Sequence, residues 1–131
     1  MVSADHGHVD CGDRLVSIDP RVLDVVESLS GEARFRWLHA KDGMEEQLLE
    51  TAVDSHSHHA WVVARDEMID KNWFGPSMSS DVASRIGDVA LLPFEPIGFA
   101  DPADTGPIDL VGRHGSLTPA EMYVPCVAQT A

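Results

Sequence analysis

The hydrophobic and polar positions of the chain switch between the period of a helix and the period of a strand. A short strand is expected at residues 15–18. Asp19 and Pro20 then suit the N-cap and first position of a helix. Apolar residues follow at helical spacing, and Gly31 comes after them: Val22, Val25, Val26 and Leu29. The pattern predicts one amphipathic helix between Asp19 and Gly31.

Residues 33–71 read as a small α/β lobe. Phe35 and Trp37 alternate with Arg34 and Arg36, which predicts a strand at 33–39 with the aromatic face buried and the arginine face solvated. Asp42 and Glu45 have the spacing of a capping box. The helix that they begin is expected to turn four residues inward: Met44, Leu48, Leu49 and Ala52. A strand at 60–64 and a helix at 66–71 complete the lobe.

Short elements are expected elsewhere in the chain. Residues 1–4 resemble the end of a buried strand, and 7–13 a loop rich in Gly and Asp. Strands are expected at 85–91, 96–100 and 123–127, with a loop at 101–107. Thr118, Pro119 and Glu121 form a capping box with proline at the first helical position, so a short helix should begin there.

Composition limits the partners of the chain. Its 131 residues amount to one domain, of which 44% are hydrophobic. A formal net charge of −13 argues against a nucleic-acid polymer or an anionic membrane as the main partner, because both bind basic surfaces. A small phosphorylated substrate remains compatible with this charge, because bound metal ions can supply positive charge locally.

The sequence also gives expectations about cellular location. It has neither a spanning apolar stretch nor a signal-peptide pattern near Met1. Cys11 and Cys126 are too few for a disulfide framework, so two reduced thiols in a cytoplasmic protein are expected.

Two glycine-flanked histidine motifs carry the candidate chemistry. Asp5-His6-Gly7 follows the first expected strand and can offer a carboxylate and an imidazole to one divalent metal. The late motif reads Gly112-Arg113-His114-Gly115-Ser116-Leu117-Thr118-Pro119-Ala120-Glu121, and Met122-Tyr123-Val124-Pro125 follows it. Only a fold can bring the two motifs into one cleft.

In order and residue type, these motifs resemble the alkaline phosphatase superfamily, in its nucleotide pyrophosphatase/type I phosphodiesterase branch. The resemblance implies a mostly parallel α/β sheet with flanking helices, over which residues 33–71 form a peripheral lobe. It also implies a metal-dependent phosphodiesterase with two divalent ions, expected to be zinc. Asp5 and His6 would bind one ion, and His114 the other.

The same resemblance implies that residues 1–131 are a single partial domain, the C-terminal portion of the catalytic domain. The nucleophile and the remaining ligands would lie upstream. The chain alone is then expected to be inactive as an enzyme, to bind metal weakly, and to self-associate through a strand whose neighbours are missing.

Other interpretations remain open. His6, His8, Asp10 and Cys11 resemble part of the metal-binding loop of metallo-β-lactamase-like hydrolases, with Cys in place of the last His. A non-enzymatic α/β binding module is a second alternative. His8 and Asp10 could instead lie at the rim of the main site. The histidines at 56, 58 and 59 suit a solvated helix end, and Arg113 suits an exposed loop.

Overall fold

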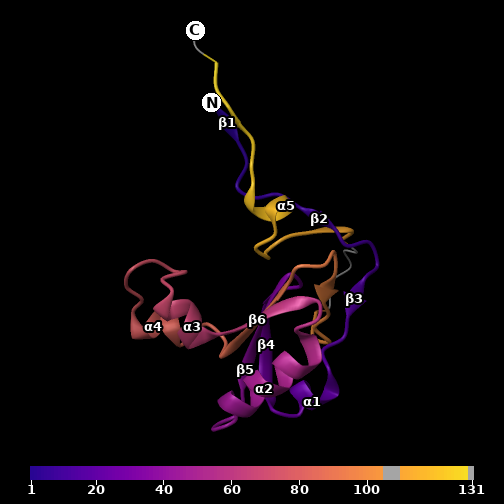
Figure 1. Ribbon diagram of the computed structural model, residues 1–131, viewed down its shortest axis with the longest axis vertical. Helices are drawn as coiled ribbons and strands as arrows, with labels where there is room; N and C mark the ends of the chain where they lie inside the picture. Colours follow the sequence, from indigo (N-terminus) through magenta and orange to yellow (C-terminus); the bar gives the residue numbers. More distant parts are fainter. Residues whose placement is uncertain (105–109, 130–131) are drawn as a thin grey trace.

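The computed structural model describes residues 1–104 and 110–129. A four-stranded antiparallel sheet forms the body, in the order β4-β5-β7-β6. A narrow arm extends from this body and carries the N-terminus together with the last described residues (Figure 1). The sheet strands are β4 (Val26–Glu32), β5 (Phe35–Ala40), β7 (Val89–Pro93) and β6 (Ala60–Ala64). The helices are α1 (Pro20–Leu23), α2 (Glu45–His56), α3 (Arg65–Asp70), α4 (Ser80–Ala83) and α5 (Pro119–Met122).

Apolar side chains are buried on both faces of this sheet. On one face, Leu38 and Leu91 pack with Val22 of α1 and with Leu48 and Ala52 of α2. A second cluster forms around four other residues, Val63, Met68, Ala90 and Leu92, with the half-buried Phe35 and Trp37 against it. Every residue of the central strand β7 is buried, because neighbouring strands and both clusters cover it.

The helix predicted between Asp19 and Gly31 is mostly wrong. Asp19 does cap α1, accepting a hydrogen bond from the Arg21 N–H, but α1 ends at Leu23 and β4 begins at Val26. β4 pairs with β5 through a tight hairpin in which Gly31 has a φ of +84°. Tertiary pairing of residues 26–32 with β5 therefore overrides the helical spacing of the valines.

The strand predicted at 33–39 is confirmed as β5, but its faces were assigned wrongly. Arg34 and Arg36 are 0% and 1% exposed, whereas Phe35 and Trp37 are half-buried. Arg36 is buried because it pairs with Asp101 at 3.2 Å and Asp104 at 2.9 Å. Arginine can stand on the inner face of a strand when carboxylates and carbonyls meet its guanidinium.

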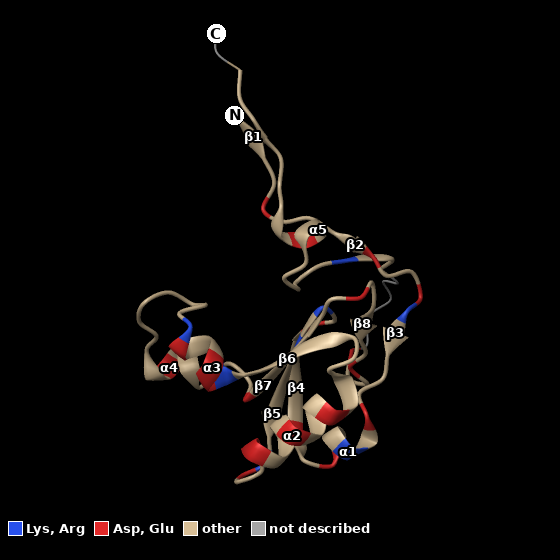
Figure 2. Cartoon of the chain, viewed as in Figure 1, with Lys and Arg blue, Asp and Glu red and all other residues tan. Residues whose placement is uncertain are grey.

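The remaining lobe predictions hold in outline. β6 matches residues 60–64, and α3 lies one residue before the predicted 66–71. α2 buries Leu48 and Ala52, while Met44 stays exposed at its N-cap, without the predicted capping box. α2 also carries several of the acidic side chains spread over the surface (Figure 2).

Elements after residue 71 depart further from expectation. The strand predicted at 85–91 lies later, as β7, and α4 was not predicted. The strand predicted at 96–100 is reduced to β8 (Gly98–Phe99), and that at 123–127 to β10 (Cys126–Val127). The loop predicted at 101–107 lies partly outside the described residues.

Three further sheets of two strands each pair segments that are distant in the sequence. β1 (Val2–Ser3) pairs with β10, and β2 (Val9–Asp10) with β9 (Gly112–Arg113), both antiparallel. Only the pair of β3 (Leu15–Val16) with β8 is parallel among the described strands. The fold is thus mixed α/β, and the mostly parallel sheet predicted for it is not found in the described residues. Residues 2–3, predicted as part of a buried strand, are exposed.

No helix within 1–104 or 110–129 has the length and apolar character needed to cross a membrane.

Candidate metal centre

The ladder between β2 and β9 brings the two sequence motifs together. Val9 pairs with Arg113 and Asp10 with Gly112, so the next position along the ladder places His8 opposite His114. Because side chains alternate along an extended strand, His6 and His8 are expected on one side and Val9 and Cys11 on the other. The early and late motifs therefore present their imidazoles to a common region.

Three imidazoles converge there. One ligand atom from each of His6, His8 and His114 lies within 4.8 Å of the other two. The rings of His6 and His114 are stacked, with centroids 3.7 Å apart. His8 stands edge-on to both, at 5.1 Å from His6 and 5.2 Å from His114. His8 is exposed, and the other two are half-buried.

Asp5 lies beside this cluster. Its carboxylate is mostly exposed, and its Oδ2 lies 3.6 Å from Nε2 of His6. The pKa of Asp5 is lowered, first by backbone hydrogen bonding and then by the neighbouring His6. Asp5 therefore stays ionised at neutral pH, the form that binds a cation.

A backbone carbonyl orients His6. Its Nδ1 lies 3.0 Å from the carbonyl oxygen of Gly7, which can only accept, so Nδ1 must donate in this hydrogen bond. In the neutral imidazole, which is the form that binds metal, Nε2 then carries the lone pair and faces Asp5. Two ligands bound at 2.0–2.1 Å to a tetrahedral zinc ion lie about 3.4 Å apart, close to the spacing of these two atoms. The donor set fits a divalent metal.

Gly7 allows the early motif to lie against α5. Its N–H donates to the carbonyl of Glu121 at 2.9 Å, and a Cβ at this position would meet the Ala120 carbonyl oxygen at 1.9 Å. This close approach of two backbone segments excludes any side chain at Gly7.

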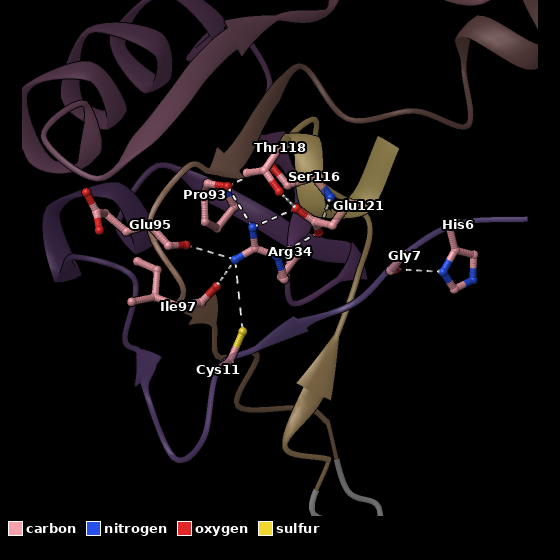
Figure 3. A network of polar contacts seen from close by, with 10 residues as sticks. All are labelled: His6, Gly7, Cys11, Arg34, Pro93, Glu95, Ile97, Ser116, Thr118 and Glu121. Carbon is pink, nitrogen blue, oxygen red and sulfur yellow. Dashed lines mark hydrogen bonds and ion pairs between the residues drawn. The ribbon is translucent and has the colours of Figure 1, made fainter. Parts of the chain in front are cut away.

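A buried ion pair anchors the late motif to the body. The Arg34 guanidinium donates to both carboxylate oxygens of Glu121 at 2.7 Å (Figure 3). The same carboxylate accepts from the Ser116 N–H and the Thr118 hydroxyl. The helix predicted from Thr118 is confirmed as α5, but Thr118 does not cap it with its side chain. Glu121 instead binds the segment that follows His114 to Arg34, in the turn between β4 and β5.

Arg113 does not lie in the exposed loop that was predicted for it. It lies on β9, is half-buried, and lines a pocket of about 130 Å³ together with His8, Glu32 and His114. Its Nε is buried and has no hydrogen-bond partner among the described residues. Its guanidinium thus adds positive charge beside the histidines.

Among the described residues, no second group of three histidine, cysteine or acidic side chains brings its ligand atoms as close together. Cys11 is fully buried, and its Sγ lies 3.9 Å from Nη1 of Arg34. Figure 3 shows Cys11 beside Arg34 and well apart from His6. Asp10 accepts a hydrogen bond from the Gly12 N–H. The structure therefore separates Cys11 from His6 and His8, contrary to the metallo-β-lactamase-like arrangement.

Sequence reasoning gave His8 a rim position in the main site, or a ligand position in the metallo-β-lactamase-like alternative. The usable signal was the spacing of His6 and His8, which places alternate residues of an extended segment on one face.

The fold resembles solved hydrolase structures. Human ectonucleotide pyrophosphatase/phosphodiesterase 5 matches 93% of this chain with a TM-score of 0.67 and 20% identity. An inactive murine form of that protein, in complex with AMP, matches 94% with a TM-score of 0.67 and 19% identity. Phosphonoacetate hydrolase from Sinorhizobium meliloti 1021, in complex with phosphonoformate, matches 95% with a TM-score of 0.63 and 19% identity.

At these identities the likeness is one of fold. The chain spans 31% of the length of the two phosphodiesterase structures and 34% of the phosphonoacetate hydrolase. Neither the comparison with family models nor that with curated proteins gives a match.

Proposed function

We propose that this chain is the C-terminal portion of a metal-dependent phosphodiesterase or nucleotide pyrophosphatase-like hydrolase domain. The convergence of His6 and His114 carries the proposal, because these residues stand near opposite ends of the chain and their rings stack at 3.7 Å. The order of the two motifs and the fold shared with phosphodiesterase and phosphonate-hydrolase structures support the same assignment.

Asp5 and His6 are the proposed ligands of one divalent ion, and His114 of a second, both zinc. Two bound ions would supply Lewis acidity and charge stabilisation for phosphoryl transfer. Asp5 contributes an anionic oxygen. His6 contributes Nε2, which the Gly7 carbonyl holds in position through Nδ1. The pairing of β9 with β2 fixes the backbone beside His114.

The nucleophile and the remaining ligands belong, in this proposal, to segments upstream of this chain. The substrate is a small phosphorylated molecule, a class that includes the AMP bound by the murine structure. The missing segments would also cover strand edges that are open here, and without them the chain would self-associate.

The experiment compares the chain with a longer protein that restores the upstream sequence. Hydrolysis of a chromogenic phosphodiester is measured with and without added zinc. We expect activity only in the longer protein, and a loss of orders of magnitude in its His114→Ala variant. His58→Ala is the control, because His58 stands in the turn after α2 and should leave activity intact.

Two results would contradict the proposal. Metal-dependent turnover by the present chain that is lost in Asp5→Ala would place the nucleophile within these residues. A longer protein that stays inactive while binding phosphorylated ligands would favour the non-enzymatic binding module.

A further inference from the structure

We propose that His8 is a metal ligand, so that His6, His8 and His114 form a three-imidazole site within this chain. The inference rests on the proposed function in taking His6 and His114 as metal ligands. It differs in one respect: in this chain without the upstream ligands, both histidines bind the same ion, whereas the complete domain divides them between two ions. It adds a residue that lies outside both motifs and changes what the chain can do by itself. One ion would be held by His6 and His8, which precede β2, and by His114, which directly follows β9.

Backbone register is the first support. His8 is the residue before β2, and it stands across from His114 in continuation of the Val9–Arg113 pair. Directly opposed residues of an antiparallel pair have Cβ atoms about 4.5–5.5 Å apart. The register therefore keeps the Cβ atoms of His8 and His114 close together, whichever rotamers the two side chains adopt.

The distances among ligand atoms are the second support. The three imidazole ligand atoms lie within 4.8 Å of one another. Each pair therefore needs to close by at most about 1.4 Å to reach the spacing of about 3.4 Å found around a tetrahedral zinc ion. His8 is exposed, so rotation about its side-chain torsions can make this adjustment without repacking the interior.

The chemistry of the donors is the third support. Three neutral imidazoles suit zinc, cobalt, nickel or copper rather than magnesium or calcium. Three histidines with one open position form a known type of zinc site. Asp5, with its carboxylate 3.6 Å from His6, lies where it can reach that fourth position.

The test is cobalt and zinc binding by the chain as it stands. Cobalt(II) reports tetrahedral coordination through its visible absorption, and calorimetry gives the zinc affinity and stoichiometry. We expect one ion per chain. His8→Ala should weaken binding at least about tenfold, and His6→Ala and His114→Ala should weaken it at least as much.

Two variants serve as controls. His58→Ala removes an exposed histidine far from the cluster in sequence and should bind as the parent does. Cys11→Ser tests the alternative loop arrangement and should also leave affinity unchanged, because Cys11 faces Arg34. Circular dichroism establishes that each variant is folded. Long-range ¹H–¹⁵N spectra of the histidine rings provide a direct readout, in which the ring nitrogens of His8 should shift on adding zinc.

The outcomes separate this inference from the proposed function. Unchanged binding in His8→Ala, together with lost binding in His6→Ala, would overturn the role of His8 and leave the hydrolase assignment standing. Absence of binding by the parent chain would also overturn the inference, whereas the hydrolase assignment is decided by the activity of the longer protein.

Discussion

Both carboxylate oxygens of Glu121 accept hydrogen bonds from Arg34, at 2.7 Å each, where the two residues are 3% and 0% exposed. Arg34 also donates to the carbonyls of Pro93, Glu95 and Ile97. One guanidinium thus joins α5, the end of β7 and the loop that follows it. The position of the late motif depends on this pair.

Breaking the pair should unfold the chain more easily. Glu121→Gln leaves the Arg34 charge buried without a counter-charge, so the free energy of unfolding should fall by about 3–5 kcal/mol. Urea denaturation followed by circular dichroism measures this change. Glu46→Gln, at an exposed position in the first turn of α2, is the matched control and should change stability little. An equal effect of both substitutions would contradict the prediction.

The same carboxylate should make stability depend on acid. Burial raises the pKa of Glu121, but hydrogen bonds from Arg34, Thr118 and Ser116 outweigh burial and leave the pKa below its ordinary value. The unfolded chain therefore takes up this proton at higher pH than the folded chain. Stability should fall as pH drops through the pKa of the unfolded and then the folded state. Glu121→Gln should lack this component in urea unfolding measured from pH 7 to pH 3.

The buried His56 should cause a second loss of stability, at milder acidity. Burial, with a smaller contribution from His59, lowers its pKa from 6.5 to about 4. The folded chain holds His56 neutral, as an acceptor from the Asp19 N–H, while the unfolded chain protonates it. Stability should therefore fall as pH drops from about 6.5 towards 4, by roughly 3 kcal/mol in total. A His56→Gln variant with the same pH dependence as the parent would contradict this.

Gly7 should tolerate no side chain. The methyl group of Gly7→Ala would overlap the Ala120 carbonyl oxygen, and relief requires moving backbone. We expect a loss of about 1–3 kcal/mol in unfolding free energy. We also expect weaker cobalt binding, because the displaced segment carries His6. Gly112→Ala is the control: its methyl would meet nothing closer than a His8 carbon at 3.9 Å. The prediction is wrong if both variants lose the same stability.

Backbone amides should exchange hydrogen slowly in the four-stranded sheet and quickly in the arm. Amides of β5 and β7 lie in the centre of the four-stranded sheet and should exchange slowest. β1 and β10 form an exposed two-residue pair with no further strand among the described residues, so their amides should exchange fastest. Mass spectrometry of a monomeric sample measures this, and the reverse order would contradict the prediction.

Local signals in the sequence predicted some elements well. β6 and α5 have clear signatures, a run of apolar residues and a Thr-Pro helix start, and both were found. β4 was missed because Val26 and Leu29, with Val22 and Val25 before them, satisfy a helical period equally well. Only pairing with β5 decides between helix and strand. The faces of β5 were misjudged because Arg34 and Arg36 acquire carboxylate partners from Glu121 and Asp101, which are distant in sequence.

The candidate site, like the fold, could be predicted only in part from the sequence. The sequence alone singled out Asp5, His6 and His114, and the structure brings His6 and His114 into ring contact. Whether they bind metal remains a prediction. The place of His8 depends on the β2–β9 register, which pairs residues about a hundred positions apart and leaves no local trace in the sequence.

The β2–β9 register also sets the order in which the molecule can form during synthesis. Residues 26–93 contain the whole four-stranded sheet, so it can fold before the late motif leaves the ribosome. His6 must wait for His114, and the buried Arg34 for Glu121. Until then Arg34 stays hydrated, and it loses that water only when its counter-charge arrives. We therefore expect the imidazole cluster to assemble after the sheet, and substitutions there should change the unfolding rate more than the folding rate.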